Sequence, residues 1–398
     1  MSVGTVRVLL LTHSYSPEVS PPQRRWDSFI YVMRSLDWDV SVVTPRSNGA
    51  EGQSSQKFGL LSNEVGLHGE RIRGYSSMKK PQGIAGKVIK HALDGFLMLP
   101  RAILQPRPDV VVATVPSLPT MFSGFLIARL LRRPLIIEMR DAWPDLISDS
   151  RILRWKWLTL FAHQTVRLIQ RKAALVVTVT DGFARVLRND GVSVVRTVHN
   201  GISTRNFEPL VQSTRETDGK LRVLYLGNLG ESQGLESVIK ASALARDIVE
   251  LRIVGAGTAS ERLRQCAKEN NVSVRFEPPA RGAAIRAHYQ WADTCVVSLR
   301  DDWKSFDHTV PSKIYELLAL GKHITGIVKG EAAEILSQAG AGDIVDHSPE
   351  NIVELWAQLA NHLEQTEVGT AGQEWVFEKA SLEKLGEKYV ELILNVAR

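Results

Sequence analysis

Residues 221–257, LRVLYLGNLGESQGLESVIKASALARDIVELRIVGAG, decide the fold. The stretch holds a β-rich apolar run at 221–226, an amphipathic run at 236–246 and a second β-rich run at 250–254. Short apolar runs without strict polar alternation indicate strands that are covered on both faces. A strand, a helix and another strand in this order predict a βαβ unit with parallel strands.

The same alternation extends toward both ends of the chain. Further strands are expected at residues 6–11, 39–43, 110–114, 135–139, 175–180, 274–276, 294–298 and 323–328. Further helices are expected at residues 25–36, 87–104, 120–131, 155–172, 259–270, 313–320, 331–338, 351–362 and 374–395. Residues 46–86 are rich in Ser, Gly and Lys, and we expect loop and short strands there.

A polar stretch at 211–220 interrupts the alternation, which then restarts. The chain has 398 residues, which is too long for one hydrophobic core. We therefore expect an α/β protein of two doubly wound, Rossmann-like domains that face each other across a cleft. The predicted domains are residues 1–205 and 206–379, and we expect the last helix, about 380–398, to pack back on the first domain.

The composition limits the class of protein. The net charge is +6 and the pI about 9.3, so the partner is expected to be anionic: a nucleic acid, a membrane surface or a diphosphate substrate. No apolar stretch reaches the roughly 18 residues of a membrane span, and the N-terminus is expected to be a strand rather than a signal peptide. Cys266 and Cys295 are expected to be unpaired thiols in a reducing cytoplasm.

Small residues follow the predicted strands of the second domain. Gly227, Asn228 and Leu229 follow its first strand, and Gly255 follows the next. Ligands bind at the carboxyl edge of such sheets. Because glycine lets a backbone approach a phosphate closely, these loops predict a nucleotide site.

The segment 309–316, Thr-Val-Pro-Ser-Lys-Ile-Tyr-Glu, adds a helix start at the same edge. Pro311 precedes Ser312, which we expect to be the N-cap. Lys313 places a cation in the first turn, where it is unfavourable for the helix unless an anion is bound. Glu316 lies one turn on, where it can accept both hydroxyls of a ribose. The segment predicts a site for a nucleotide-sugar diphosphate.

With these motifs and the segments 199–202 (His-Asn-Gly-Ile), 254–257 (Val-Gly-Ala-Gly) and 141–145 (Asp-Ala-Trp-Pro-Asp), the chain resembles the family-4-type glycosyltransferases of the GT-B fold. More narrowly, it is similar to bacterial enzymes that elongate O-antigen or capsule precursors with amino- or deoxyhexoses. The resemblance implies a UDP-sugar donor, retention of the anomeric configuration and a saccharide acceptor.

The resemblance also implies roles for single residues. Gly227 and Asn228 would line the diphosphate, and residues 278–281, including Arg281, would hold the base. Ser312 and Lys313 would hold phosphate, and Glu316 the ribose.

This chain departs from the family at two places. His308 stands where the family has an acid near the donor sugar, and Asn228 and Gln233 replace an Arg and a Lys of the first glycine loop. Lys313 therefore carries more of the phosphate charge, and His308 is a candidate contact for the sugar. A helix terminus with a lysine needs no metal, so neither a metal nor another cofactor is expected.

The first domain supplies the candidate acceptor residues, which are His13, Arg24, Arg25 and Arg140. The arginine pair would bind an acceptor phosphate or the donor; the alternative is surface salt bridging. The alternative for His13, which is the more frequent one for such a histidine, is a structural role. Asp141 is the candidate base for the acceptor hydroxyl, and the alternative is that it orients a loop. With Lys313 at the leaving group, Asp141 completes the predicted catalytic pair.

Two segments, 79–101 and 151–172, combine Lys and Arg with large apolar residues, and they predict contact with an anionic membrane surface through the first domain. The alternative is ordinary packing of two amphipathic helices on their sheet. No nucleic-acid-binding module is found. The leading hypothesis is a cytoplasmic enzyme at the inner face of the cell membrane that glycosylates a lipid-linked saccharide. Two rivals stay open: a UDP-sugar 2-epimerase of the same fold, and a non-catalytic nucleotide-sugar-binding partner of a polysaccharide assembly complex.

Overall fold

The computed structural model describes residues 5–18, 20–46, 61–78, 84–115, 117–140, 156–205, 207–210 and 219–397. The chain forms two units. Unit 1 consists of Met1–Ser203 and Leu382–Arg398, and unit 2 of Thr204–Ser381. The sequence prediction places these boundaries after residues 205 and 379.

Unit 1 is an eight-stranded sheet in the order β3-β4-β2-β1-β5-β6-β7-β8. Its strands are β1 Arg7–Leu11, β2 Asp39–Arg46, β3 Leu61–Val65, β4 Arg71–Ser76, β5 Val110–Val115, β6 Leu135–Met139, β7 Leu175–Thr178 and β8 Val195–Thr197. Its helices are α1 Pro21–Ser35, α2 Ile84–Ile103, α3 Leu118–Leu131, α5 Lys156–Lys172, α6 Asp181–Asn189 and α14 Leu382–Ala397. Only the edge strand β3 pairs antiparallel, and the other described pairs are parallel.

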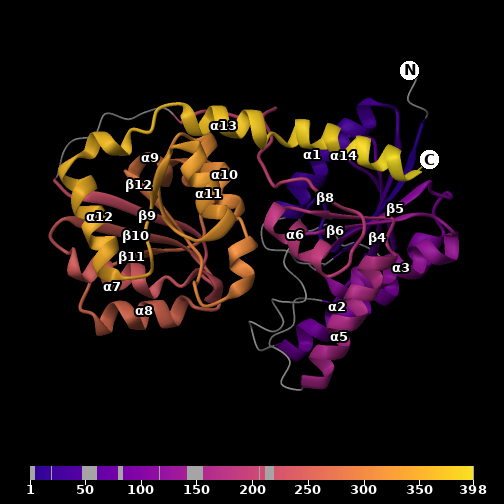
Figure 1. The fold of residues 1–398 in the computed structure, drawn as a ribbon, viewed down its shortest axis with the longest axis horizontal. Helices are drawn as coiled ribbons and strands as arrows, with labels where there is room; N and C mark the ends of the chain where they lie inside the picture. The colour runs from indigo at the N-terminus through magenta and orange to yellow at the C-terminus, as the bar shows by residue number, and fades with distance from the viewer. Residues whose placement is uncertain are drawn as a thin grey trace. The chain divides into compact units, whose positions relative to one another are not determined.

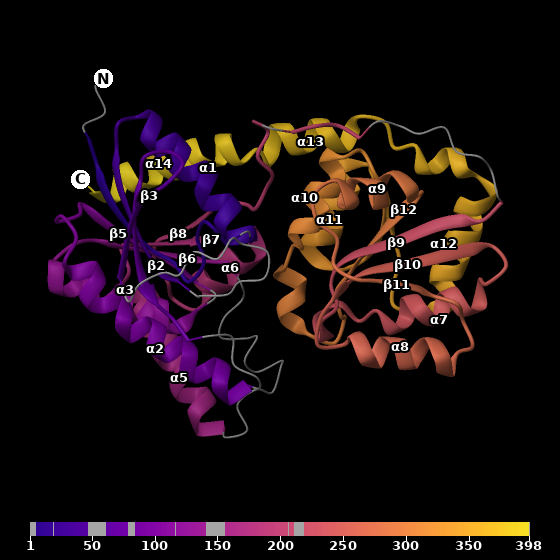
Figure 2. The same cartoon turned by 180° about the vertical axis from the view of Figure 1, so that it is seen from behind.

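Helices cover both faces of this sheet, as Figures 1 and 2 show. One face packs on α1 and α14 through a core that includes Trp26, Phe29 and Tyr389. The opposite face packs on α2, α3, α5 and α6 through Met98, Met121 and other apolar side chains. The sheet is therefore the middle layer of three, which explains why a central strand such as β5 is buried along its whole length.

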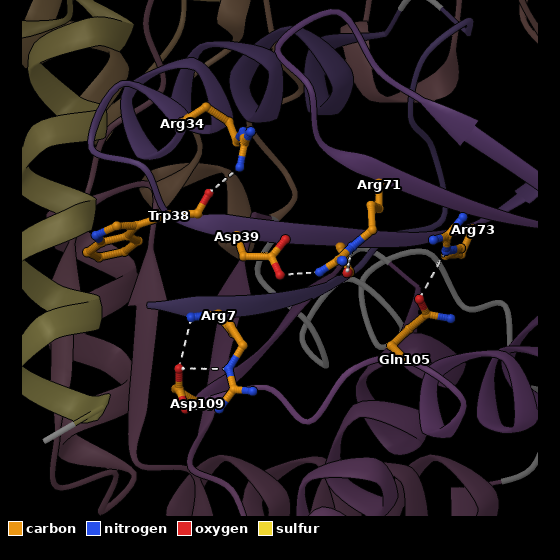
Figure 3. Close-up of polar contacts among 9 residues, drawn as sticks. Arg7, Arg34, Trp38, Asp39, Arg71, Arg73, Gln105 and Asp109 are labelled. Atoms are coloured by element: carbon orange, nitrogen blue, oxygen red, sulfur yellow. Dashed lines mark hydrogen bonds and ion pairs between the residues drawn. The ribbon is translucent and has the colours of Figure 1, made fainter. Parts of the chain in front are cut away.

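Figure 3 shows the edge of the unit 1 sheet at which its parallel strands begin, where polar side chains link neighbouring strands. Arg7 at the start of β1 donates to Asp109, which precedes β5, with an Nη2–Oδ1 distance of 3.3 Å. Arg71 of β4 pairs with Asp39 of β2. These ion pairs are partly exposed, so each adds little to stability on its own.

Unit 2 is a six-stranded parallel sheet in the order β11-β10-β9-β12-β13-β14. Its strands are β9 Leu221–Asn228, β10 Val249–Ala256, β11 Arg275–Glu277, β12 Thr294–Ser298, β13 His323–Ile327 and β14 Gly342–Ile344. Its helices are α7 Glu236–Leu244, α8 Ser260–Glu269, α9 Ala283–Trp291, α10 Ser312–Ala319, α11 Gly330–Ala339, α12 Pro349–Asn361 and α13 Ala371–Lys379. Short 3-10 turns are η1 Glu231–Gln233, η2 Lys304–His308 and η3 Leu363–Thr366.

The α/β class and two doubly wound, Rossmann-like units are confirmed. One predicted element is wrong: residues 374–395 form two helices, α13 and α14, rather than one. The helix breaks where the chain leaves unit 2, because Leu382 N–H donates to the carbonyl of Ile202 at 3.0 Å instead of to a helical carbonyl. The prediction also missed α6, α9, β8 and β14, of which the two strands have only three residues each.

Candidate functional site

The start of α10 lies at the carboxyl edge of the unit 2 sheet, after β12 and η2. Pro311 is the N-cap, and Ser312 is the first residue of the helix. No side chain makes a capping hydrogen bond, so the predicted capping role of Ser312 is wrong. The fixed φ of proline, −59° here, already suits the cap position. The amides of Ser312 and Lys313 have no acceptor within the helix, because they belong to its first turn.

Lys313 and Glu316 meet Tyr289 of α9 in a closed set of polar contacts. The Lys313 ammonium donates to the Tyr289 hydroxyl at 2.9 Å and to Glu316 Oε2 at 3.0 Å. The Tyr289 hydroxyl donates to Glu316 Oε1 at 3.1 Å. Tyr289 is buried, whereas Lys313 and Glu316 are each a little more than a quarter exposed. The buried phenol therefore fixes the position of two charged groups that solvent can reach.

This arrangement leaves capacity for a ligand. An ammonium has three protons, and two of those of Lys313 are used, so one remains for a phosphate oxygen. Each Glu316 oxygen accepts one of these bonds and keeps a lone pair for a hydroxyl. A cation beside a helix N-terminus attracts an anion, and the carboxylate one turn away attracts hydroxyl donors.

The glycine loops at the ends of β9 and β10 lie side by side. Gly227 is the register partner of Gly255, and Asn228 of Ala256. A Cβ on Gly255, whose φ is +152°, would stand 1.9 Å from the carbonyl oxygen of Gly227. Glycine is thus required at 255 by contact between the two loops themselves, in addition to any need of a ligand.

In the first loop, Asn228 is exposed and Leu229 is buried. Asn228 is exposed, and its carbonyl accepts from the Tyr225 hydroxyl at 2.7 Å, which holds the loop. Leu229 is buried in the core, its N–H donates to Ala256 O, and its carbonyl accepts from Ala259 N–H. The prediction that Leu229 contacts the donor is therefore wrong, since the residue is committed to packing.

Gln233 and Gly230 close the same loop, with Gln233 Oε1 accepting from Gly230 N–H at 3.0 Å. Arg281 is exposed in the connection from β11 to α9, and His308 is half-buried at the end of η2. Both connections start from the carboxyl edge of the sheet, which is the edge that carries α10.

Adjacent acids at 301 and 302 are each engaged by a cation. Asp302 accepts two bonds from Arg300 at 2.7 and 2.6 Å, and this pair lowers the pKa of the Asp302 carboxyl. Asp301 lies 3.6 Å from Lys329. Among the described residues, no group of three or more His, Cys, Asp or Glu could hold a metal ion.

In unit 1, the start of α1 follows the loop after β1. Ser20 is its N-cap and accepts from Gln23 N–H at 3.3 Å. Pro21 and Pro22 occupy the first two helical positions and have no N–H. The first three positions of α1 therefore offer no amide to an anion, so any anion bound there would depend on side chains such as the exposed Arg24.

Arg25 corrects the sequence prediction. Its guanidinium is 2% exposed and forms an ion pair with Glu138 of β6, with an Nε–Oε1 distance of 2.8 Å. It also donates to the backbone carbonyls of Val198 and His199. The other Glu138 oxygen accepts from Trp26 Nε1 at 2.9 Å. Arg25 binds α1 to β6 and to the segment after β8, and it is not available to an acceptor.

His13 and Arg140 lie near each other at the carboxyl edge of the unit 1 sheet. Burial, followed by the charges of Arg140, His91 and Lys90, lowers the pKa of His13 to about 4. His13 is therefore a neutral imidazole at pH 7. Arg140 is half-buried, and its backbone N–H donates to the backbone carbonyl of Val115 at 3.2 Å. Asp141, the predicted base, lies outside the described residues, as do all residues of the 141–145 motif.

The sequence prediction missed Tyr289 and Glu138. Glu138 had a signal, since a lone carboxylate inside the apolar strand Leu135–Met139 requires a buried partner. Tyr289 had only a weak one, the apolar spacing of Ile285 and Tyr289 on a short helix.

The sequence comparisons cover most of the chain. The model of the glycosyl transferase 4-like domain matches residues 22–201, and that of glycosyl transferases group 1 matches residues 206–374. A protein of Escherichia coli K12 named as a colanic acid biosynthesis glycosyl transferase, WcaI, is 31% identical over 163 residues. The match spans 40% of this chain and only 39% of that relative.

Solved structures match over nearly the full length. Anabaena HepE in complex with UDP and glucose has a TM-score of 0.68 at 13% identity, covering 98% of this chain and 99% of that one. Sucrose-phosphate synthase of Thermosynechococcus elongatus has a TM-score of 0.70 at 14% identity, covering 98% of each chain. The lipopolysaccharide outer core galactosyltransferase WaaB has a TM-score of 0.60 at 12% identity, covering 98% of this chain and 99% of that one. At these identities the likeness shows the fold alone.

Proposed function

Since the chain belongs to the family-4-type glycosyltransferases of the GT-B fold, we propose that it transfers a sugar from a UDP-sugar to a saccharide acceptor. The sugar is a hexose, an N-acetylamino sugar or a deoxy sugar, and its anomeric configuration is retained. The acceptor is a lipid-linked saccharide, a precursor of O-antigen, capsule or a related cell-surface polysaccharide.

The contacts among Tyr289, Lys313 and Glu316 carry the donor part of this proposal. They bring together a cation, a helix N-terminus and a carboxylate at the carboxyl edge of unit 2, and this carboxylate is the proposed partner of the ribose hydroxyls. These are the groups that a nucleoside diphosphate requires. HepE, whose fold this chain shares, is described in complex with UDP and with UDP-glucose.

The proposed chemistry places the leaving diphosphate at Lys313. Negative charge develops on the diphosphate as the glycosidic bond breaks, and the third Lys313 proton and the α10 amides stabilise it. We propose that this charge is neutralised without a metal ion. Asp141 is the proposed base for the acceptor hydroxyl, and His308 a proposed contact of the donor sugar.

The acceptor part of the proposal is supported by the relatives' names and by charge. WcaI is named for colanic acid biosynthesis, and WaaB for the lipopolysaccharide outer core. The exposed Arg24 and the half-buried Arg140 can bind the phosphate of a lipid-linked acceptor. We propose that the enzyme acts at the inner face of the cell membrane, where an anionic surface attracts unit 1.

A donor panel tests the function. Purified protein is incubated with UDP-sugars and lipid-linked acceptors, and UDP release and glycosylated product are both measured. Lys313→Ala should lower kcat about 100- to 1000-fold, the effect of removing one stabilising donor from a transition state. Lys240→Ala, which removes an exposed lysine of α7, is the control. Thermal stabilisation by UDP but no turnover with any donor would favour the non-catalytic rival.

A further inference from the structure

The outward face of α2 is apolar over four turns. The exposed large apolar residues are Ile89, Leu93, Phe96, Leu97 and Ile103, followed by Leu104 directly after the helix, and Phe96 and Leu104 are 69% and 75% exposed. Their spacing places them on one side of the helix. An ordinary surface helix turns its polar side outward, so the orientation of α2 requires a reason.

The inward side of α2 carries the core residues Met98 and Ala102 together with polar groups that have partners. Lys90 forms an ion pair with Asp94 at 2.6 Å and donates to Ser77 Oγ at 2.7 Å. Arg101 donates to the carbonyl of Ser62 at 2.6 Å. These bonds hold α2 against β3 and the segment after β4, and they prevent the helix from rotating its apolar face inward.

The neighbouring helices α3 and α5 also expose apolar side chains. Figures 1 and 2 show α2, α3 and α5 together on one side of the unit 1 sheet. Leu126 and Leu130 of α3 and Leu160 and Leu168 of α5 are exposed, between 49% and 66%. We call this set of residues on α2, α3 and α5 the outer face of unit 1.

A basic pocket opens between α3 and α5. It has a volume of about 320 Å³, an apolar wall that includes Phe125 and Leu135, and three cations, Arg129, Arg133 and Lys172. Among the described residues that line it there is no carboxylate. The Arg133 Nε atom is buried and has no hydrogen-bond partner among the described residues. Such a pocket suits a phosphate attached to an apolar group.

The charge of the three-helix layer exceeds that of the whole chain. The segment from α2 to the end of α3, residues 84–133, and α5, residues 156–172, contain eleven Lys or Arg and two Asp, a net charge of +9, compared with +6 for all 398 residues. Lys90 and Arg101 bond on the sheet side of α2 and Arg167 pairs with Asp190, so these three add little to the charge of the outer face. A protein partner that covers an apolar face has no need of this excess. An anionic lipid surface satisfies both properties, because its acyl chains accept the apolar side chains and its headgroups accept the cations.

We propose that the outer face of unit 1 lies in the interface of an anionic membrane, with α2 inserted and a lipid phosphate held in the basic pocket between α3 and α5. Within the described residues no helix is long and apolar enough to cross a membrane. The inserted depth is that of an interfacial helix, about 5–10 Å. The inference deepens the proposed function, because it identifies the surface through which a lipid-linked acceptor is reached.

The inner side of α2 explains how this surface reaches the acceptor residues. Lys90, His91 and Asp94 of α2 all act on the pKa of His13. The start of α2 therefore lies beside the acceptor loop. The basic pocket lies beside Leu135, at the amino end of β6, so the phosphate held there is that of a membrane lipid and not that of the acceptor.

Vesicle binding tests the proposal with the full-length protein. Sedimentation is measured with phosphatidylcholine vesicles and with vesicles that also contain phosphatidylglycerol, at low and high salt. Phe96→Glu should weaken binding to the anionic vesicles about tenfold or more, because it removes an aromatic side chain that the membrane would bury. Leu244→Glu, at a 61% exposed position on α7, is the matched control and should bind like the unchanged protein.

The basic pocket has its own variant. Replacing Arg129 and Lys172 by Gln should weaken binding roughly fivefold per cation at low salt and reduce the salt dependence. Lys240→Gln on α7 is the charge control. Binding of inorganic phosphate alone is measured as a comparison. If phosphate binds in the pocket but anionic vesicles do not bind the protein, the pocket is an anion site and not a lipid site.

Three results would overturn the inference: no binding to anionic vesicles, equal loss with Leu244→Glu, or self-association that Phe96→Glu abolishes without vesicle binding. UDP release with a lipid-free acceptor analogue separates this inference from the proposed function. If that activity is present and vesicle binding absent, the surface is wrong and the function stands. If vesicle binding is present and no donor turns over, the surface stands and the function is wrong.

Discussion

Replacing Glu138 by Gln should destabilise unit 1 strongly, although the change alters only one charged group. Glu138 is fully buried and accepts from both Arg25 and Trp26. The amide of Gln keeps one acceptor oxygen but turns an NH2 group toward the second donor. The positive charge of Arg25 then remains buried without its counter-charge.

The size of the effect follows from burial. Removing one partner of a buried ion pair costs about 3–5 kcal/mol, since the remaining charge is desolvated and uncompensated. For a domain of 150–250 residues, each kcal/mol lowers the melting temperature by roughly 2–4 °C. We therefore expect Glu138→Gln to lower the melting temperature of unit 1 by about 6–20 °C.

Calorimetry measures the transition, and hydrogen exchange of peptides from α1 and β6 assigns it to unit 1. Asp109→Asn is the matched control, because it breaks an ion pair with Arg7 whose side chains are 45% and 27% exposed. An exposed pair contributes at most about 1 kcal/mol, so this control should melt within about 4 °C of the unchanged protein.

A double variant sharpens the test. Arg25→Met with Glu138→Leu removes both charges and should recover part of the lost stability, since no buried charge is left alone. Recovery is incomplete because the carbonyls of Val198 and His199 lose a donor. If Glu138→Gln melts within about 2 °C of the unchanged protein, the ion pair does not hold α1 to β6.

Two further predictions concern the site. Tyr289→Phe removes the hydroxyl that joins Lys313 to Glu316 and should weaken UDP binding about 5- to 70-fold by calorimetric titration, from the loss of about 1–2.5 kcal/mol in bonds to charged groups. Unchanged affinity would contradict a positioning role. His13, with its folded pKa of about 4 below the unfolded value of 6.5, stabilises the fold above pH 6.5, and this stability is lost as the pH falls toward 4. Between pH 7 and pH 5 the loss should be about 2 kcal/mol, and denaturant unfolding of His13→Gln should show a decline smaller by that amount. An equal decline in both proteins would refute this reading of His13.

The strands and their edges were predictable because they depend on local composition. A run such as Val110–Val115 is buried on both faces and therefore apolar throughout, so its sequence alone indicates a central strand. The order of strands and helices then places the loops of unit 2 at one edge. Strands β8 and β14 have three residues each, which is too short for any periodicity to be visible.

The sequence by itself determined the alternation of strands and helices, the position of the glycine loops, and the placement of Lys313 and Glu316 one turn apart on one helix face. All three follow from spacing along the chain. Only the tertiary structure decided which side chains meet across elements. Tyr289 of α9 contacts Lys313 of α10, and Arg25 of α1 faces inward because it pairs with Glu138 of β6. The sequence also left undetermined which face of α2 is exposed, because the helix has apolar side chains on both sides. The hydrogen bonds of Lys90 to Ser77 and of Arg101 to Ser62 decide the orientation.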